Sequence, residues 1–213
     1  MSKQDALARI NQGVAKFQSE IFPAQREMFE RLQLGQEPLA LFITCADSRV
    51  NPNLVTQTSP GEIFIERNPG NMVPPYVEFV GGVTAGVEYA VLVLKVPVIV
   101  ICGHTDCGVM KALLNPEGVE DMPGVRHWMS HGFAARNRML NRYGKCPEAD
   151  QLRHLTELNV LEQIEHLQTH PSVRSRLDGD EIEIRGWVYD IGTGSVREHN
   201  PATRSFESLA AVG

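Results

Sequence analysis

The sequence lacks an uninterrupted apolar run long enough to cross a lipid bilayer. Its most apolar stretch, EYAVLVLKVPVIVICG (88–103), is interrupted by Lys95 and Pro97. Neither side of the interruption reaches the roughly 20 apolar residues that a membrane helix needs. The N-terminal residues also lack the apolar core and small-residue cleavage site of a secretory signal. These absences predict a soluble cytoplasmic protein with no membrane partner.

The sequence also has no excess of positive charge and no flexible linker. Its formal net charge is -6, which disfavours a nucleic-acid partner because such a partner requires a basic surface. No segment rich in proline, glycine and serine divides the 213 residues. We therefore expect one domain over residues 1–213, in which residues 1–35 form an N-terminal helical arm.

Several common cofactor motifs are missing. There is no GxGxxG and no phosphate-binding P-loop, which argues against nucleotide cofactors. No Cys-x-x-Cys occurs, so a thioredoxin-like redox site is disfavoured. The HxE…PCxxC signature of zinc deaminases is absent as well. Any catalytic or metal site in this sequence therefore has to use another set of residues.

The patterns that are present alternate between strand and helix, which predicts an α/β fold with a mainly parallel central sheet flanked by helices. A C-terminal hairpin is expected to add an antiparallel edge. The expected strands are 39–44, 62–66, 96–102, 181–190 and 195–199. The expected helices are 3–34 with a break near Phe22 and Pro23, 83–95, 107–114, 123–142 and 152–170.

Two of the expected strands are followed directly by clusters of reactive side chains. Cys45 follows the strand 39–44, and His104 and Cys107 follow the strand 96–102. Sites in open α/β sheets form beyond the carboxyl ends of strands, so adjacent strands would bring these three residues together. Two thiolates and one imidazole suit Zn²⁺, and three protein ligands leave a fourth position for water. We predict one zinc ion per chain at a catalytic site.

Asp47 and Arg49 stand at alternate positions after Cys45, so all three side chains share one face of an extended backbone. An Asp–Arg ion pair there would place an acceptor beside the metal-bound water. If Arg49 were displaced, Asp47 would be able to act as a fourth ligand in an inactive state. Taken singly, Cys45 is most simply a buried thiol, and Asp47 and Arg49 a helix cap and a surface ion pair.

These motifs resemble one known family. CADSR (45–49) and GHTDCG (103–108) look like the two signature blocks of β-class carbonic anhydrases, and PGEIFIERNPGNMVPP (60–75) and GVEYAVLVLKV (86–96) are also similar. The branch that it resembles most includes bacterial and plant-like enzymes, some of them associated with cyanate metabolism. The resemblance implies reversible hydration of CO2 to bicarbonate and a proton by zinc-bound hydroxide.

The same resemblance implies roles for further residues. Cys45, His104 and Cys107 would bind zinc, and Asp47 and Arg49 would form the catalytic dyad. The substrate pocket would include Gln36, Phe64, Tyr89 and a backbone contact from Gly108. The family also implies a homodimer or higher homo-oligomer, in which the N-terminal helices pack on a partner subunit.

Two other functions are compatible with the same residues. One is hydrolysis of a related heterocumulene, carbon disulfide or carbonyl sulfide, on the same scaffold. The other is a closed structural zinc site in which Asp47 is a permanent fourth ligand and no catalysis occurs. We rank both below carbonic anhydrase activity.

Overall fold

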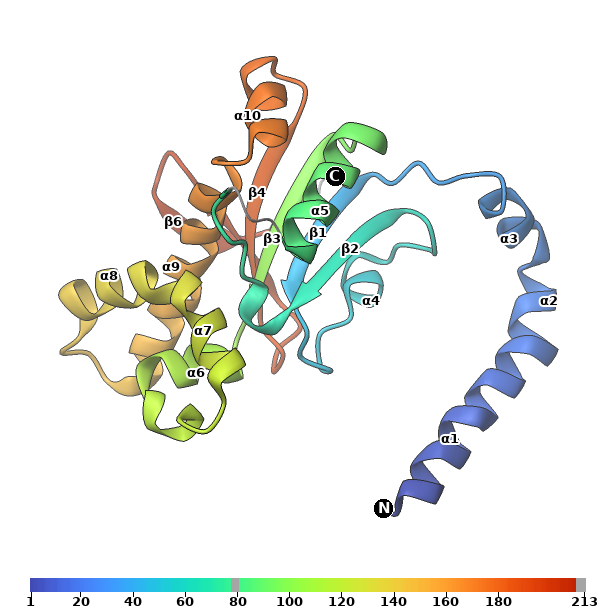
Figure 1. Cartoon of the computed structure of the whole chain (residues 1–213), viewed down its shortest axis with the longest axis horizontal. Helices are drawn as coiled ribbons and strands as arrows, with labels where there is room; N and C mark the ends of the chain where they lie inside the picture. The colour runs from blue at the N-terminus through green and yellow to red at the C-terminus, as the bar shows by residue number, and fades with distance from the viewer. Residues whose placement is uncertain (78–80, 210–213) are drawn as a thin grey trace. The chain divides into compact units, whose positions relative to one another are not determined.

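The computed structural model describes residues 1–77 and 81–209 (Figure 1). The chain divides into two compact units, Met1–Glu37 and Pro38–Gly213. None of the helices in the described ranges is long and apolar enough to cross a membrane.

The first unit is helical. Helix α1 (Lys3–Lys16) starts at a capping box, in which Ser2 and Asp5 exchange side-chain-to-backbone hydrogen bonds. A π-helical turn, η1 (Phe17–Ile21), and the short helices α2 (Phe22–Ala24) and α3 (Arg26–Leu32) follow. The helix is interrupted at Gln25, two residues after Pro23, close to the break that the sequence predicts.

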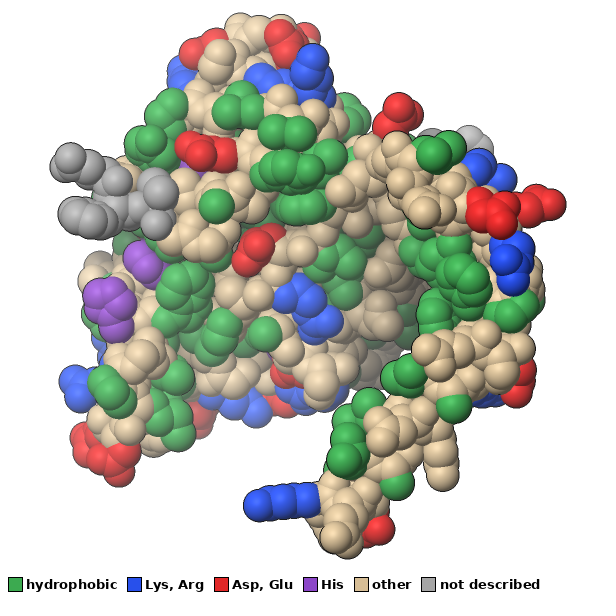
Figure 2. Space-filling view, turned by 45° about the vertical axis from the view of Figure 1, so that its right-hand side comes forward, with side chains coloured by type: hydrophobic (Ala, Val, Ile, Leu, Met, Phe, Trp, Pro, Cys, Tyr) green, Lys and Arg blue, Asp and Glu red, His purple; other side chains and the backbone are tan. Residues whose placement is uncertain are grey.

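The apolar stripe of α1 is exposed within its unit. Leu7, Ile10 and Val14 are 59%, 64% and 50% exposed, and Figure 2 shows apolar side chains along this segment. A helix with polar residues on one side and exposed apolar residues on the other needs a surface to cover its apolar face.

The second unit contains one sheet with the strand order β2-β1-β3-β4-β5-β6. The first four strands in that order are parallel, and β5 and β6 are antiparallel. This confirms the predicted mainly parallel sheet with an antiparallel C-terminal edge. The strands are β1 (Ala40–Cys45), β2 (Ile63–Asn68), β3 (Val98–His104), β4 (Glu183–Tyr189), β5 (Val196–Asn200) and β6 (Ser205–Ser208).

The central strands are buried on both faces, which explains their continuous apolar sequences. On one face their side chains join the main core: Leu41, Ile43, Ile99 and Ile101. On the other face Phe42, Val100 and Cys102 form a smaller cluster. Burial raises the pKa of Cys102 to about 12, so this thiol packs as an apolar group, as its place in a strand predicts.

Helices flank the sheet (Figure 1). They are α4 (Pro52–Thr56), α5 (Gly82–Glu88) with its π-helical continuation η3 (Tyr89–Val93), α6 (Gly108–Leu114), α7 (Pro123–Met129), α8 (Phe133–Tyr143), α9 (Glu148–Leu167) and α10 (Pro171–Asp178). The short helices α4 and α10 and the strand β6 are additions to the elements expected from the sequence.

The single helix expected over 123–142 is wrong, because α7 and α8 are separated by the 3₁₀ turn η5 (Ser130–Gly132). Gly132 shows the physical reason. A Cβ atom on Gly132 would lie 2.8 Å from Leu113 and 2.9 Å from Met72. The backbone has to bend and approach the core closely at this point, which only a residue without a side chain permits.

Candidate metal centre

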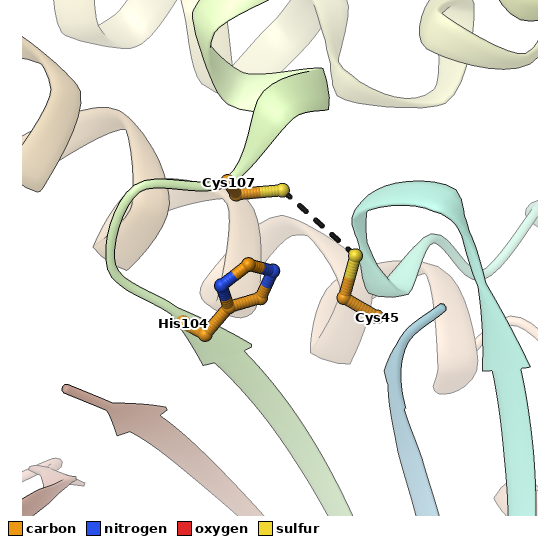
Figure 3. Close-up of side chains that lie close together, drawn as sticks. All are labelled: Cys45, His104 and Cys107. Atoms are coloured by element: carbon orange, nitrogen blue, oxygen red, sulfur yellow. Dashed lines mark hydrogen bonds between the residues drawn. The ribbon is translucent and has the colours of Figure 1, made fainter. Parts of the chain in front are cut away.

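Cys45, His104 and Cys107 converge at one edge of the sheet (Figure 3). Cys45 ends β1 and His104 ends β3, and these two strands are neighbours in the sheet. Cys107 immediately precedes α6. Their ligand atoms all lie within 4.8 Å of one another, and all three residues are buried. The carboxyl ends of two adjacent parallel strands therefore bring the three side chains together, as the sequence predicts.

The turn between the two ligands of the second motif depends on an aspartate. Asp106 has a φ of 61°, the left-handed region that Asp tolerates better than most residues. Gly103, the residue before the histidine ligand, lies inside β3. A Cβ there would lie 2.9 Å from Val160 of α9, so Gly103 permits close packing of helix on strand.

The imidazole of His104 is oriented for metal binding. Its Nδ1 lies 2.9 Å from the carbonyl oxygen of Thr105, which can only accept, so Nδ1 carries the proton. The lone pair is then on Nε2, which is buried and has no hydrogen-bond partner among the described residues. A buried acceptor left without a partner is costly, and a metal ion would satisfy it.

The two sulfur atoms lie 4.0 Å apart. The Gly70 N–H also donates to the Cys45 sulfur at 3.4 Å. The hydrogen bond from Cys107 is the main cause that lowers the pKa of Cys45 to about 4, and it raises the pKa of Cys107.

The donor set fits zinc. Zinc–sulfur bonds of about 2.3 Å in a tetrahedron place two sulfurs roughly 3.8 Å apart, close to the separation observed here. Two sulfurs and one imidazole nitrogen are the donors that zinc prefers. Three such donors leave one tetrahedral position open, which is the arrangement of a catalytic site.

Asp47 and Arg49 form a bidentate ion pair beside this cluster. Arg49 Nε donates to Asp47 Oδ1 at 2.9 Å, and Nη2 donates to Oδ2 at 2.7 Å. Hydrogen bonds from Arg49 hold the pKa of the Asp47 carboxyl well below its usual range. Asp47 Oδ2 lies 4.0 Å from His104 Nε2, so the carboxylate borders the metal position.

Arg67 supports the loop that carries these residues. Its Nη2 donates to the Asp47 carbonyl oxygen at 2.7 Å, and its Nε donates to the Cys45 carbonyl oxygen at 3.1 Å. The backbone between the first cysteine and the dyad is therefore tied to β2. Both contacts are charge-assisted, which makes them stronger than hydrogen bonds between neutral groups.

A mostly apolar hollow of about 300 Å³ adjoins Cys45 and Asp47. Its other lining residues are Ala46, Pro69, Gly108, Val109, Ala112, Val119 and Val125. Val119 and Val125 stand far from both motifs in the sequence, and no local pattern marks them. Val109 lies two positions after Cys107, and this closeness to a ligand would have marked it as a residue of the site.

Of the residues expected to form the substrate pocket, only one lines this hollow. Gly108 lines the hollow beside the cysteine. Phe64 and Tyr89 are outside that lining, and they pack on each other with ring centroids 5.9 Å apart. Tyr89 is 46% exposed. Gln36 is exposed in the first unit, directly before its end at Glu37. The roles of these last three residues stay predictions.

Comparison with known proteins identifies relatives along most of the chain. The family model described as "Carbonic anhydrase" matches residues 40–196. A carbonic anhydrase of Pseudomonas aeruginosa is 45% identical over 198 residues, covering 93% of this chain and 90% of the relative. Carbonic anhydrase 1 of Escherichia coli O157:H7 is 45% identical over 208 residues, covering 96% of this chain and 93% of the relative.

Solved structures with a similar fold are also β-carbonic anhydrases. The β-carbonic anhydrase CcaA superposes with a TM-score of 0.93 at 38% identity, covering 96% of this chain and all of that one (100%). A tetrameric β-carbonic anhydrase from Sordaria macrospora gives a TM-score of 0.80 at 28% identity, covering 91% of this chain and 96% of that one.

Proposed function

The chain belongs to the carbonic anhydrase family, and we propose that Asp47 and Arg49 orient the reactants beside a metal held by three ligands. The protein is a zinc-dependent β-class enzyme, a lyase that catalyses the reversible hydration of CO2 to bicarbonate and a proton. The observation that carries the assignment of residues is the convergence of Cys45, His104 and Cys107 next to the Asp47–Arg49 pair. Hydrolysis of carbon disulfide or carbonyl sulfide is not favoured, since the two relatives at 45% identity are carbonic anhydrases.

Cys45, His104 and Cys107 would hold the zinc ion through two sulfurs and Nε2. When bound, zinc supplies the Lewis acidity that makes water a nucleophile near neutral pH. The Thr105 carbonyl keeps the proton of His104 on Nδ1, and the Gly70 N–H supports the Cys45 thiolate. Such contacts behind the ligands fix their orientation and their donor strength.

Asp47 would accept a hydrogen bond from the attacking water and so direct its lone pair toward CO2. Its carboxylate stays ionised at neutral pH because Arg49 stabilises the charged form. Arg49 also engages both carboxylate oxygens, which keeps them away from the open metal position. If Arg49 were displaced, Asp47 would be free to become a fourth ligand, giving an inactive state. X-ray absorption and activity, measured on the zinc protein across pH, would test this. A change in the atoms bound to zinc without a matching change in activity would contradict it.

The apolar hollow would receive CO2, an uncharged linear molecule that gains little from polar contacts. Val109, Val119 and Val125 make the wall of this hollow apolar, which would disfavour water there. Gly108 lies in the first turn of α6, where the N–H has no intrahelical acceptor and would donate to a substrate oxygen. Phe64, Tyr89 and Gln36 would complete the pocket from the side of a subunit interface.

Filling the hollow should impair substrate use without removing the metal. We expect Val125→Trp to lower kcat/KM for CO2 by about tenfold, because a few added methylene-sized groups change pocket binding by this order. Stopped-flow CO2 hydration and zinc analysis of the purified variant would measure the two effects. Val125→Ala, which enlarges the same hollow, is the matched control and should change kcat/KM less. Full activity of Val125→Trp at normal zinc content would show that the hollow is not used by substrate.

We propose that the enzyme is a homodimer or a higher homo-oligomer, and that α1 packs on a partner subunit. The exposed apolar stripe of α1 supports this, and a structural relative is tetrameric. We also propose a cytoplasmic location, because thiolate ligands persist best in a reducing compartment. Recovery in a membrane or secreted fraction would argue against that location.

Charges on the stripe should weaken the assembly. We expect Ile10→Glu combined with Val14→Glu to lower the mass found by sedimentation equilibrium, because each buried carboxylate would have to lose its hydration. Gln12→Glu, on the opposite side of the same helix, is the control and should leave the mass unchanged. An unaltered mass for the double variant would exclude the stripe from the interface.

A further inference from the structure

Asp106 lies in the loop that carries two of the metal ligands, and it contacts Arg49. It lies between His104 and Cys107, in the loop that follows β3. Its Oδ2 accepts a hydrogen bond from Arg49 Nη1 at 2.9 Å, and its carbonyl oxygen accepts one from Arg49 Nη2 at 3.2 Å. Arg49 belongs to the loop that follows β1, 57 positions away. The guanidinium therefore links the two loops that carry the metal ligands.

The contacts of Arg49 are divided between two carboxylates. Nε and Nη2 donate to the Asp47 carboxylate, and Nη1 donates to the Asp106 carboxylate. Nη2 makes a second bond, to the backbone carbonyl oxygen of Asp106. A planar guanidinium bound on one edge alone can pivot about the ion pair. A second anchor on another edge removes that freedom, because the five N–H donors of arginine are rigidly arranged.

The position of Asp106 suits it to hold the Arg49 guanidinium in place. Its left-handed backbone, with a φ of 61°, restricts the residue types that fit. Lys111 of α6 also contacts the Asp106 carboxylate, so this acid has two cationic partners. The lysine offsets the negative charge that Asp106 brings to the edge of the site.

We propose that Asp106 is a positioning residue, which holds the Arg49 guanidinium so that Arg49 in turn keeps Asp47 directed at the substrate. The proposal rests on the dyad role given above for Asp47 and Arg49. Asp106 touches neither substrate nor metal in this role, and it acts only through the arginine.

The direct test is Asp106→Asn. Asparagine has the same shape and tolerates the left-handed backbone, so the substitution removes the charge with little strain. Charge-assisted hydrogen bonds are about twice as strong as neutral ones, and at this exposure we expect kcat to fall by about fivefold. KM, zinc content and unfolding temperature should stay at the parent values. Heteronuclear NMR of the Arg49 Nε–H should show greater mobility in the variant.

A matched control is available at Asp180. This residue is also an exposed aspartate with a left-handed backbone, with a φ of 54°, and it lies beyond the end of α10. Asp180→Asn should leave kcat and the Arg49 signal unchanged. An equal loss in this control would mean that the effect of Asp106→Asn comes from backbone strain or net charge, and would overturn the proposal.

A double-mutant cycle separates this proposal from the proposed function. In an Arg49→Met background, Asp106→Asn should cost nothing further, because its partner is gone. A full fivefold loss in that background would overturn the proposal, as would an unchanged kcat in the single variant. If Arg49→Met itself kept full activity with zinc bound, the proposed dyad role of Asp47 and Arg49 would be wrong.

Lys111→Met provides a test that leaves the metal loop untouched, should Asp106→Asn fold poorly. It removes the second cation of Asp106 and leaves the whole carboxylate to Arg49. We expect kcat at or above the parent value. A loss of the same size as that expected for Asp106→Asn would overturn the proposal, because charge balance rather than restraint of Arg49 would then explain both.

Discussion

Replacing Cys107 with serine is expected to abolish zinc binding and, with it, CO2 hydration. Cys107 is 1% exposed, and its sulfur lies 4.0 Å from that of Cys45. A serine hydroxyl stays protonated near neutral pH and is a poor zinc ligand, whereas a thiolate is a strong one. Loss of the metal should remove most of the acceleration of 10⁶-fold or more that is typical of enzymes, so the expected activity is about that of buffer alone.

Metal analysis and stopped-flow CO2 hydration on the same sample would measure this result. Cys146→Ser is the matched control, because it makes the same chemical change at a half-buried cysteine outside the cluster. That variant should keep full zinc and full activity. A Cys107→Ser protein that retained one zinc per chain and normal turnover would exclude Cys107 as a ligand.

Asp47→Asn should separate catalysis from metal binding. The three metal ligands are untouched, so zinc content should equal that of the parent. The amide is nearly the same size as the carboxylate but carries no charge, and it offers one acceptor oxygen where the carboxylate offers two. Since positioned acid–base groups contribute about 10²- to 10⁴-fold, we expect kcat to fall by about 10²-fold. Activity equal to that of the parent would contradict the assigned role.

The pH dependence of that deficit follows from the charge state of Asp47. Arg49 holds the pKa of this carboxyl below its ordinary value of 3.8. A lowered pKa in the folded state stabilises the protein above the unfolded value, and this contribution is lost as the pH falls through the folded value. Asp47 therefore does not titrate near neutral pH. While Arg49 stays paired with Asp47, the ratio of parent to variant kcat should be constant between about pH 6 and pH 9.

Local sequence patterns were sufficient for the elements that carry the site. The runs that became β1 and β3 are continuously apolar, rather than alternating with polar residues, because both faces of these strands are buried. The assignment of Cys45 and His104 to the site then follows from their positions, since each ends a strand at the carboxyl edge of the sheet. The split between α7 and α8 was missed because it depends on the approach of Gly132 to Leu113 and Met72.

The sequence by itself determined the kind of chemistry, because ligand type, ligand spacing and the Asp47–Arg49 alternation are properties of short segments. Only the tertiary structure decided which distant residues complete the site. Val119 and Val125 line the hollow, and Asp106 reaches Arg49 across the metal loops, because the sheet order places β1 beside β3. Such contacts join segments far apart in the chain, and they arise from packing that no local periodicity encodes.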